Sequence, residues 1–124
     1  MAKRIVVVED NDLNRKLFCD VLKSQGYAVE PVADGLDALD RAREFVPGLI
    51  IMDIQLPNVS GLDLIQQAKA DKLLRHVPVL AVTAEAAPDE VRACLDSGMD
   101  GHVAKPIDRD DLLGAIAEAT RIRA

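Results

Sequence analysis

The sequence predicts an α/β domain with a doubly wound fold, in which five helices cover both faces of a five-stranded parallel sheet. Short apolar runs alternate with segments whose apolar residues recur at helical spacing. Strict alternation of this kind implies parallel strands joined by right-handed crossovers. One run, residues 49–52, is apolar at every position, which is typical of a strand buried on both faces. The expected strand order is 2-1-3-4-5, a common doubly wound pattern.

Length and composition favour one small domain with an aliphatic core. We expect the 124 residues to form a single domain, residues 1–124, without an attached output domain. Nearly half of the residues are hydrophobic, yet only two Phe and one Tyr occur. The net charge of −6 and the absence of basic clusters argue against direct binding to nucleic acid. No apolar stretch is long enough for a membrane span, and two cysteines without paired spacing suit the reducing cytoplasm.

The first half of the chain contains two strands and two helices. A strand is expected at residues 4–8, and Asn11 is a good N-cap for a helix that ends at Gly26. This helix presents an apolar pattern at helical spacing: Leu13, Leu17, Phe18, Val21 and Leu22. Residues 27–32 form a more polar strand, as expected at a sheet edge. A second helix follows the turn at residues 34–35, and its apolar residues are Leu36, Ala38, Leu39, Ala42 and Phe45.

The second half repeats this alternation three times. Ser60 can cap a third helix after the strand that ends at Asp53, and residues 77–82 form a fourth strand that ends at Thr83. Pro88 suits the first turn of a fourth helix, which Ser97 and Gly98 close. Residues 101–104 form the fifth strand, and Asp108 can cap the last helix. The apolar residues of these three helices are Leu62, Leu64, Ile65 and Ala68; Ala87, Val91 and Leu95; and Leu112, Leu113 and Ile116.

Functional side chains follow four of the five predicted strands. They are Glu9 and Asp10, Asp53, Thr83 and Lys105. Taken alone, each is more simply explained as an ordinary turn or strand-end residue. Because the carboxyl ends of parallel strands lie along one edge, where open α/β sheets bind their ligands, the coincidence predicts a shared site.

The chemistry of these groups suits phosphoryl transfer to a carboxylate. Three carboxylates in one cleft repel one another unless one is protonated or a cation is bound. Oxygen ligands in a shallow site favour Mg²⁺. Asp53 is the predicted nucleophile, while Lys105 and Thr83 are placed to hold the phosphoryl oxygens.

The chain resembles the receiver domain of two-component response regulators, which has the same flavodoxin-like and CheY-like fold. The resemblance covers essentially the whole chain and rests on Glu9-Asp10, Met52-Asp53 with Pro57 and Gly61, Thr83-Ala84 and Lys105-Pro106. It implies that Asp53 accepts a phosphoryl group from a sensor histidine kinase. It also implies Mg²⁺ ligands: Asp10 directly, Glu9 partly through water, Asp53, and the backbone carbonyl of Gln55. Thr83 matches the switch hydroxyl, and the peptide bond before Pro106 is usually cis in such domains.

One residue departs from the family pattern. Receiver domains commonly have Tyr or Phe three residues before the lysine, and here that position is His102. The family aromatic turns inward when the threonine moves toward the phosphoryl group. The His102 side chain is smaller than that of Tyr or Phe. Two interpretations stay open: His102 replaces the aromatic switch, or it is an ordinary half-exposed strand residue.

Within the family, the closer resemblance is to a single-domain receiver that regulates bacterial cell division and cell fate. It implies histidine-kinase and phosphatase partners and output through a downstream protein, by a monomer or weak dimer. The residues that carry it are Val8 to Asn11, Asn14, Lys16 to Phe18, Gly26-Tyr27, and Met52 to Pro57 with Ser60 to Leu62.

Other functions fit the residues less well. A shuttle that passes phosphate to a histidine phosphotransferase, or an adaptor that is never phosphorylated, stays open. Phosphohydrolases with an aspartate nucleophile use a second Asp two positions later, where Gln55 stands here. A flavodoxin-like cofactor carrier is disfavoured because Glu9 and Asp10 would repel a phosphate. On this basis the chain catalyses only its own phosphorylation and dephosphorylation.

Overall fold

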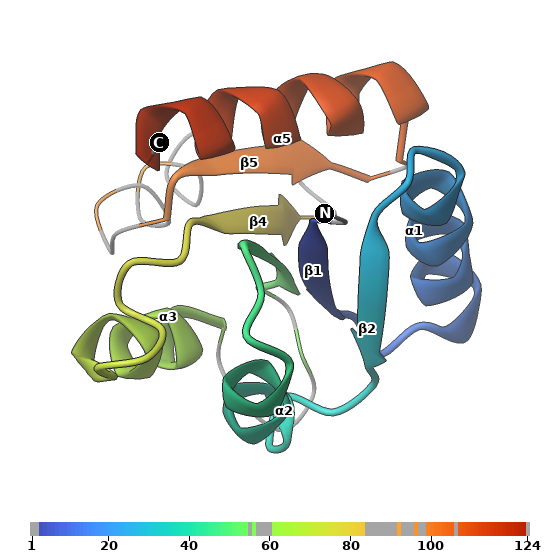
Figure 1. Ribbon diagram of the computed structural model, residues 1–124. Helices are drawn as coiled ribbons and strands as arrows, with labels where there is room; N and C mark the ends of the chain where they lie inside the picture. The colour runs from blue at the N-terminus through green and yellow to red at the C-terminus, as the bar shows by residue number, and fades with distance from the viewer. Residues whose placement is uncertain are drawn as a thin grey trace.

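The structure, a computed structural model, describes residues 3–54, 56, 61–83, 92, 96, 99–105 and 107–123, without the side chains of Leu62 and residues 121–123. Strands and helices alternate through the described part (Figure 1). The strands are β1 (Arg4–Val8), β2 (Ala28–Val32), β3 (Leu49–Asp53), β4 (Val79–Thr83) and β5 (Gly101–Ala104). The helices are α1 (Asp12–Ser24), α2 (Ala38–Phe45), α3 (Gly61–Ala70) and α5 (Arg109–Arg123). The predicted fourth helix lies largely outside the described residues.

The five strands form one parallel sheet in the order β2-β1-β3-β4-β5, which confirms the predicted fold. The register aligns Val8 with Met52, Asp53 with Val82, and Thr83 with Ala104. Consequently β1, β3, β4 and β5 end within two residues of one another. This register brings the predicted site residues to the same edge.

Helices cover both faces of the sheet and divide the core into two layers (Figure 1). On one face, α1 and α5 pack on alternate residues of four strands. On the other face, α2 and α3 pack on the intervening residues. β3 is buried at all five positions because both layers use it, as its continuous apolar run predicts. The largest side chains of the α1 and α5 layer include Phe18, Leu22, Ile51, Leu112 and Ile116.

The predicted helix caps are confirmed where they are described. The side chain of Asn11 accepts a hydrogen bond from the Asn14 N–H at 2.9 Å. Asp108 likewise accepts from the Asp111 N–H at 3.0 Å. Gly26 follows α1 with φ of +89°, a left-handed conformation that glycine adopts without strain. No described helix has both the length and the apolar composition needed to cross a membrane.

Three leucines that belong to the apolar helix patterns of the sequence are exposed in the structure. Leu13 is 77% exposed and Leu17 41% exposed, because α1 turns Phe18 and Leu22 toward the sheet instead. Leu36 is 65% exposed and precedes α2, where its N–H donates to the carboxylate of Asp34 in the turn. The apolar pattern of α1 is wider than the strip of helix that the sheet can cover.

Candidate functional site

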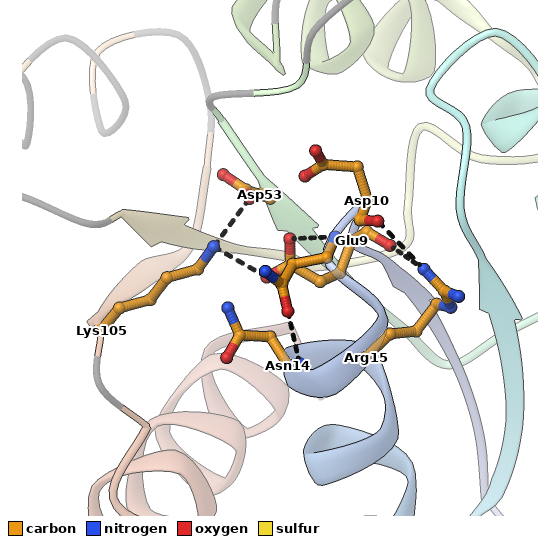
Figure 2. Close-up of polar contacts among 7 residues, drawn as sticks. Glu9, Asp10, Asn14, Arg15, Asp53 and Lys105 are labelled. Atoms are coloured by element: carbon orange, nitrogen blue, oxygen red, sulfur yellow. Dashed lines mark hydrogen bonds and ion pairs between the residues drawn. The ribbon is translucent and has the colours of Figure 1, made fainter.

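Three carboxylates meet at the carboxyl edge of the sheet (Figure 2). Glu9 and Asp10 follow β1, and Asp53 is the last residue of β3. One oxygen atom from each lies within 4.8 Å of those from the other two. Glu9 and Asp53 are buried, whereas Asp10 is exposed. The cluster is therefore closed on the core side and open to solvent at Asp10.

Lys105 extends across this edge from the end of β5. Its Nζ lies 2.9 Å from Oδ2 of Asp53 and 2.8 Å from Oε1 of Glu9 (Figure 2). Its backbone N–H donates to the carbonyl oxygen of Thr83 at 2.8 Å, one residue beyond β5. The sheet ladder therefore positions the lysine stem, and its ammonium group joins two of the three carboxylates.

The remaining predicted site residues differ in what the structure describes of them. Thr83 is a buried polar residue at the end of β4, on the same sheet edge as Asp53. His102 is exposed on β5, next to Val103, which packs in the α1 and α5 layer. Because successive strand side chains alternate between faces, His102 lies on the opposite face. Gln55 and Pro106, and with them the predicted carbonyl ligand and cis bond, lie outside the described residues.

Burial and charge shift the protonation of this site. The pKa of Glu9 is raised to about 7, first by burial and then by a hydrogen bond to Asp53, while Lys105 opposes the shift. Burial lowers the pKa of Lys105, but its close contacts with the Glu9 and Asp53 carboxyl groups outweigh that effect and the pKa rises overall. The site thus retains a proton on Glu9 and a charged lysine to offset carboxylate repulsion.

The donor set fits a hard divalent cation. All three groups are carboxylates, which are ligands that Mg²⁺ favours, and exposed Asp10 leaves room for bound water. Oε1 of Glu9 is buried and accepts no hydrogen bond of good geometry from the described residues, although the Lys105 ammonium lies close to it. A cation at the cluster would engage this oxygen.

Two residues near the site were not predicted from the sequence. Arg15 on α1 hydrogen bonds the backbone of Glu9 and Asp10, a contact that no helical periodicity signals. Gly61, named above only as one of the residues that carry the family resemblance, begins α3 in close contact with Ile54, the residue after Asp53. A Cβ atom at Gly61 would lie 2.5 Å from Cα of Ile54. The sequence could have pointed to Gly61 because this glycine stands where a helix begins rather than where one ends.

Comparison with known proteins agrees with this arrangement. A family model described as the response regulator receiver domain matches residues 5–117. Polar-differentiation response regulators named DivK from Brucella ovis and Brucella abortus are 48% identical over 107 residues. The match covers 86% of this chain and 87% of each relative. DivK is the single-domain receiver that the sequence resembles, so the predicted resemblance is confirmed.

Solved structures give the same result. The chemotaxis response regulator CheY4 of Vibrio cholerae superposes with a TM-score of 0.90 at 25% identity, over 96% of this chain and 99% of that one. The receiver domain of a sensor histidine kinase from Pseudomonas aeruginosa PAO1 gives 0.88 at 33% identity, over 98% and 99%. That structure has a magnesium ion coordinated in its active site cleft. The family match and the close relatives together show that this chain belongs to the response regulator receiver domain family.

Proposed function

We propose that this chain is a phosphorylation-dependent signalling switch, in which Asp53 accepts a phosphoryl group from a histidine kinase. The observation that carries the proposal is the position of the Asp53 carboxylate. It lies beside two further carboxylates and 2.9 Å from the Lys105 ammonium, at an edge open to solvent through Asp10. This arrangement supplies a nucleophile, a cation site and a fixed positive charge.

Each residue has a distinct role in the proposed reaction. A carboxylate oxygen of Asp53 forms a bond to phosphorus as the bond from phosphorus to the donor histidine nitrogen breaks. Glu9, Asp10 and Asp53, and by the family resemblance the carbonyl of Gln55, would hold Mg²⁺, which when bound would neutralise charge on the phosphoryl oxygens. Lys105 pairs with the transferred group, and the Thr83 hydroxyl donates a hydrogen bond to it. The chain thereby catalyses its own phosphorylation and no reaction on a released substrate.

In this proposal, the protein passes on its signal because phosphorylation changes the surface that contacts other proteins. Phosphorylation adds a charge of roughly −1.5 to −2, and phosphate favours one of two pre-existing states. Thr83 at the end of β4 moves toward the phosphoryl group. The surface of α5 and the opposite face of β5, which carries His102, respond to this movement and alter which partner binds. The resemblance to polar-differentiation regulators points to control of cell polarity and division through such protein contacts.

Acetyl phosphate with Mg²⁺ tests the proposal directly. The intact mass of the wild type should rise by roughly 80 Da, because one acyl phosphate (aspartyl phosphate) forms at the carboxylate. Asp53→Asn and wild type in EDTA should show no increase. Asp63→Asn, which alters an exposed acid on α3, is the matched control and should be labelled like wild type.

Two results would count against the switch. An unchanged wild-type mass, under conditions that label a known receiver domain, would favour an adaptor that is never phosphorylated. Rapid turnover of small phosphate esters would favour a phosphohydrolase. If labelling succeeds, transfer of the label to a histidine phosphotransferase distinguishes a shuttle from a terminal switch.

A further inference from the structure

Arg15 forms an unusual set of contacts beside the carboxylate cluster (Figure 2). It lies near the start of α1, and its side chain is 20% exposed. Its Nη1 donates to the carbonyl oxygens of Glu9 at 2.9 Å and of Asp10 at 3.3 Å. Its Nη2 contacts the carboxylate of Asp12. One guanidinium therefore joins α1 to the backbone of two adjacent acidic residues.

The backbone at this point has left the sheet. The N–H of Glu9 still donates to the carbonyl oxygen of Val32 at 3.0 Å, continuing the ladder with β2. Beyond that bond, the carbonyl groups of Glu9 and Asp10 accept from Arg15. Charge-assisted hydrogen bonds from a planar guanidinium are strong and directional, so they restrict the conformation of these two residues.

The side chain of Asp10 depends on this backbone for its position. Among the residues that the structure describes, none donates a hydrogen bond to its carboxylate or forms an ion pair with it. Glu9, by contrast, is held by burial, by Lys105 and by the Asn11 N–H at 3.4 Å. Hence the contribution of Asp10 to the cluster is set by where its main chain is held.

We infer that Arg15 is a positioning residue of the cation site, which orients Asp10 and Glu9 toward Asp53 through their main-chain carbonyl groups. The inference rests on the proposed function only in assigning Mg²⁺ to this cluster. Groups that orient metal ligands typically change metal affinity roughly 10- to 100-fold when they are replaced. Loss of Arg15 should therefore weaken Mg²⁺ binding even though Arg15 does not contact the ion.

A purely electrostatic role predicts the opposite sign. Arg15 places a positive charge beside the main chain of Glu9 and Asp10, so removing that charge alone would strengthen the binding of a cation. Arg15→Gln removes both the positive charge and the planar set of guanidinium hydrogen-bond donors. Arg15→Lys retains the charge but replaces the planar fork with a single ammonium group. If Arg15 positions the ligands, both variants bind Mg²⁺ more weakly than wild type.

Titration of the full chain with Mg²⁺, followed by amide chemical shifts, measures this affinity in the folded protein. Arg15→Gln and Arg15→Lys should each raise the Kd roughly tenfold. The matched control is Lys16→Gln, which removes the charge of the next residue of α1. Lys16 is exposed, and its Nζ lies 3.7 Å from Oδ2 of Asp20. Its Kd should stay within about twofold of wild type, because an exposed ion pair contributes little.

A second readout separates positioning from general damage to the fold. The half-saturating Mg²⁺ concentration for labelling by acetyl phosphate should rise by the same factor as the Kd. The labelling rate at saturating Mg²⁺ should stay close to that of wild type, since Asp53 and Lys105 are unchanged. A variant that loses rate at saturation without any change in Kd would contradict the positioning role.

The outcomes for the two proposals differ. An unchanged Kd in Arg15→Lys, or a lower Kd in Arg15→Gln, overturns the role of Arg15 and leaves the proposed function intact. A wild type that binds Mg²⁺ but takes up no phosphoryl group overturns the proposed function, while the titrations still decide the role of Arg15. A wild type that binds no Mg²⁺ overturns both.

Discussion

Glu9 and Asp10 are adjacent acids in very different environments. Glu9 is 1% exposed and shares its surroundings with Asp53 and Lys105, whereas Asp10 faces solvent. Burial disfavours the charged form of a carboxyl group, so Glu9 holds its proton to about pH 7. Glu9 therefore loses its proton, and becomes available as an anionic ligand, only near neutrality.

This difference predicts how stability changes with pH when no metal is present. Below pH 4.5 Glu9 is protonated in both the folded and unfolded chain. Between pH 4.5 and about 7 only the unfolded chain releases its proton, so the free energy of unfolding falls as pH rises. The contribution of Glu9 is at most roughly 3 kcal/mol. Lys105, whose pKa is also raised, contributes a stabilisation that is constant across this window and is lost only at alkaline pH.

Urea unfolding in EDTA at several pH values checks the prediction. Relative to wild type, Glu9→Gln should gain stability progressively as pH rises from 4.5 to about 7, and the difference should then level off. Asp71, whose pKa is lowered by Arg43, titrates alike in both proteins and cancels from the comparison. A wild-type and variant difference that is constant across this range would show that Glu9 is not the group responsible.

The first residue of α3 packs against the residue that directly follows β3, next to the proposed phosphoacceptor. Gly61 opens α3, and any Cβ there would lie 2.5 Å from Cα and 3.1 Å from Cβ of Ile54. Because the nearer atom is backbone, the clash can be relieved only by moving α3 or the residue directly after Asp53. The close approach therefore couples the packing of a helix to the position of the proposed phosphoacceptor.

Gly61→Ala should lower the free energy of unfolding by roughly 1–3 kcal/mol, the usual effect of forcing a group into a packed site. It should also slow labelling of Asp53. Gly114→Ala is the matched control: Gly114 lies within α5, and a Cβ there meets no atom within 4 Å. That change should stabilise by about 0.5–1 kcal/mol, because alanine favours the helix. Urea midpoints measure both, and a Gly61→Ala protein as stable as wild type would rule out the steric coupling.

At the scale of the whole molecule, the sheet gathers carboxylates from two separate strands onto one edge. Their repulsion opposes folding, and a bound cation relieves it. Mg²⁺ should therefore stabilise the folded chain by about 2.7 kcal/mol at 100 times its Kd, provided that the unfolded chain binds none. Thermal unfolding at increasing Mg²⁺ measures the effect, which should appear as a rising Tm.

Thermal unfolding of variants at increasing Mg²⁺ identifies which carboxylates bind the ion. Asp10→Asn should greatly reduce the Mg²⁺-dependent rise in Tm, while Asp63→Asn, on exposed α3, should retain it. Without metal, Asp10→Asn should be at least as stable as wild type, because Asp10 loses repulsion and no hydrogen bond among the described residues. A full Mg²⁺ response in Asp10→Asn would place the cation elsewhere.

Several features of the fold and of the site were predictable because their signals are local. Alternation of apolar runs with helical patterns indicated five parallel strands, and Asn11, Gly26 and Asp108 marked helix ends. Since parallel strands end along one edge, the order of strand-end residues was enough to group Asp53 with Lys105. The exposure of Leu13 and Leu36 was not predictable, because a helix pattern does not show how much of it the sheet will cover.

The sequence by itself determined the order of the elements, the edge at which the acids and the lysine meet, and the family, since these depend on short-range pattern and residue type. Only the tertiary structure decided that Glu9 is buried beside Lys105, that Arg15 holds the main chain of Glu9 and Asp10, and that Gly61 has no room for a side chain. The physical reason is common to all three. Burial, charge coupling and close contact are properties of atoms brought together by folding, and no local pattern records them.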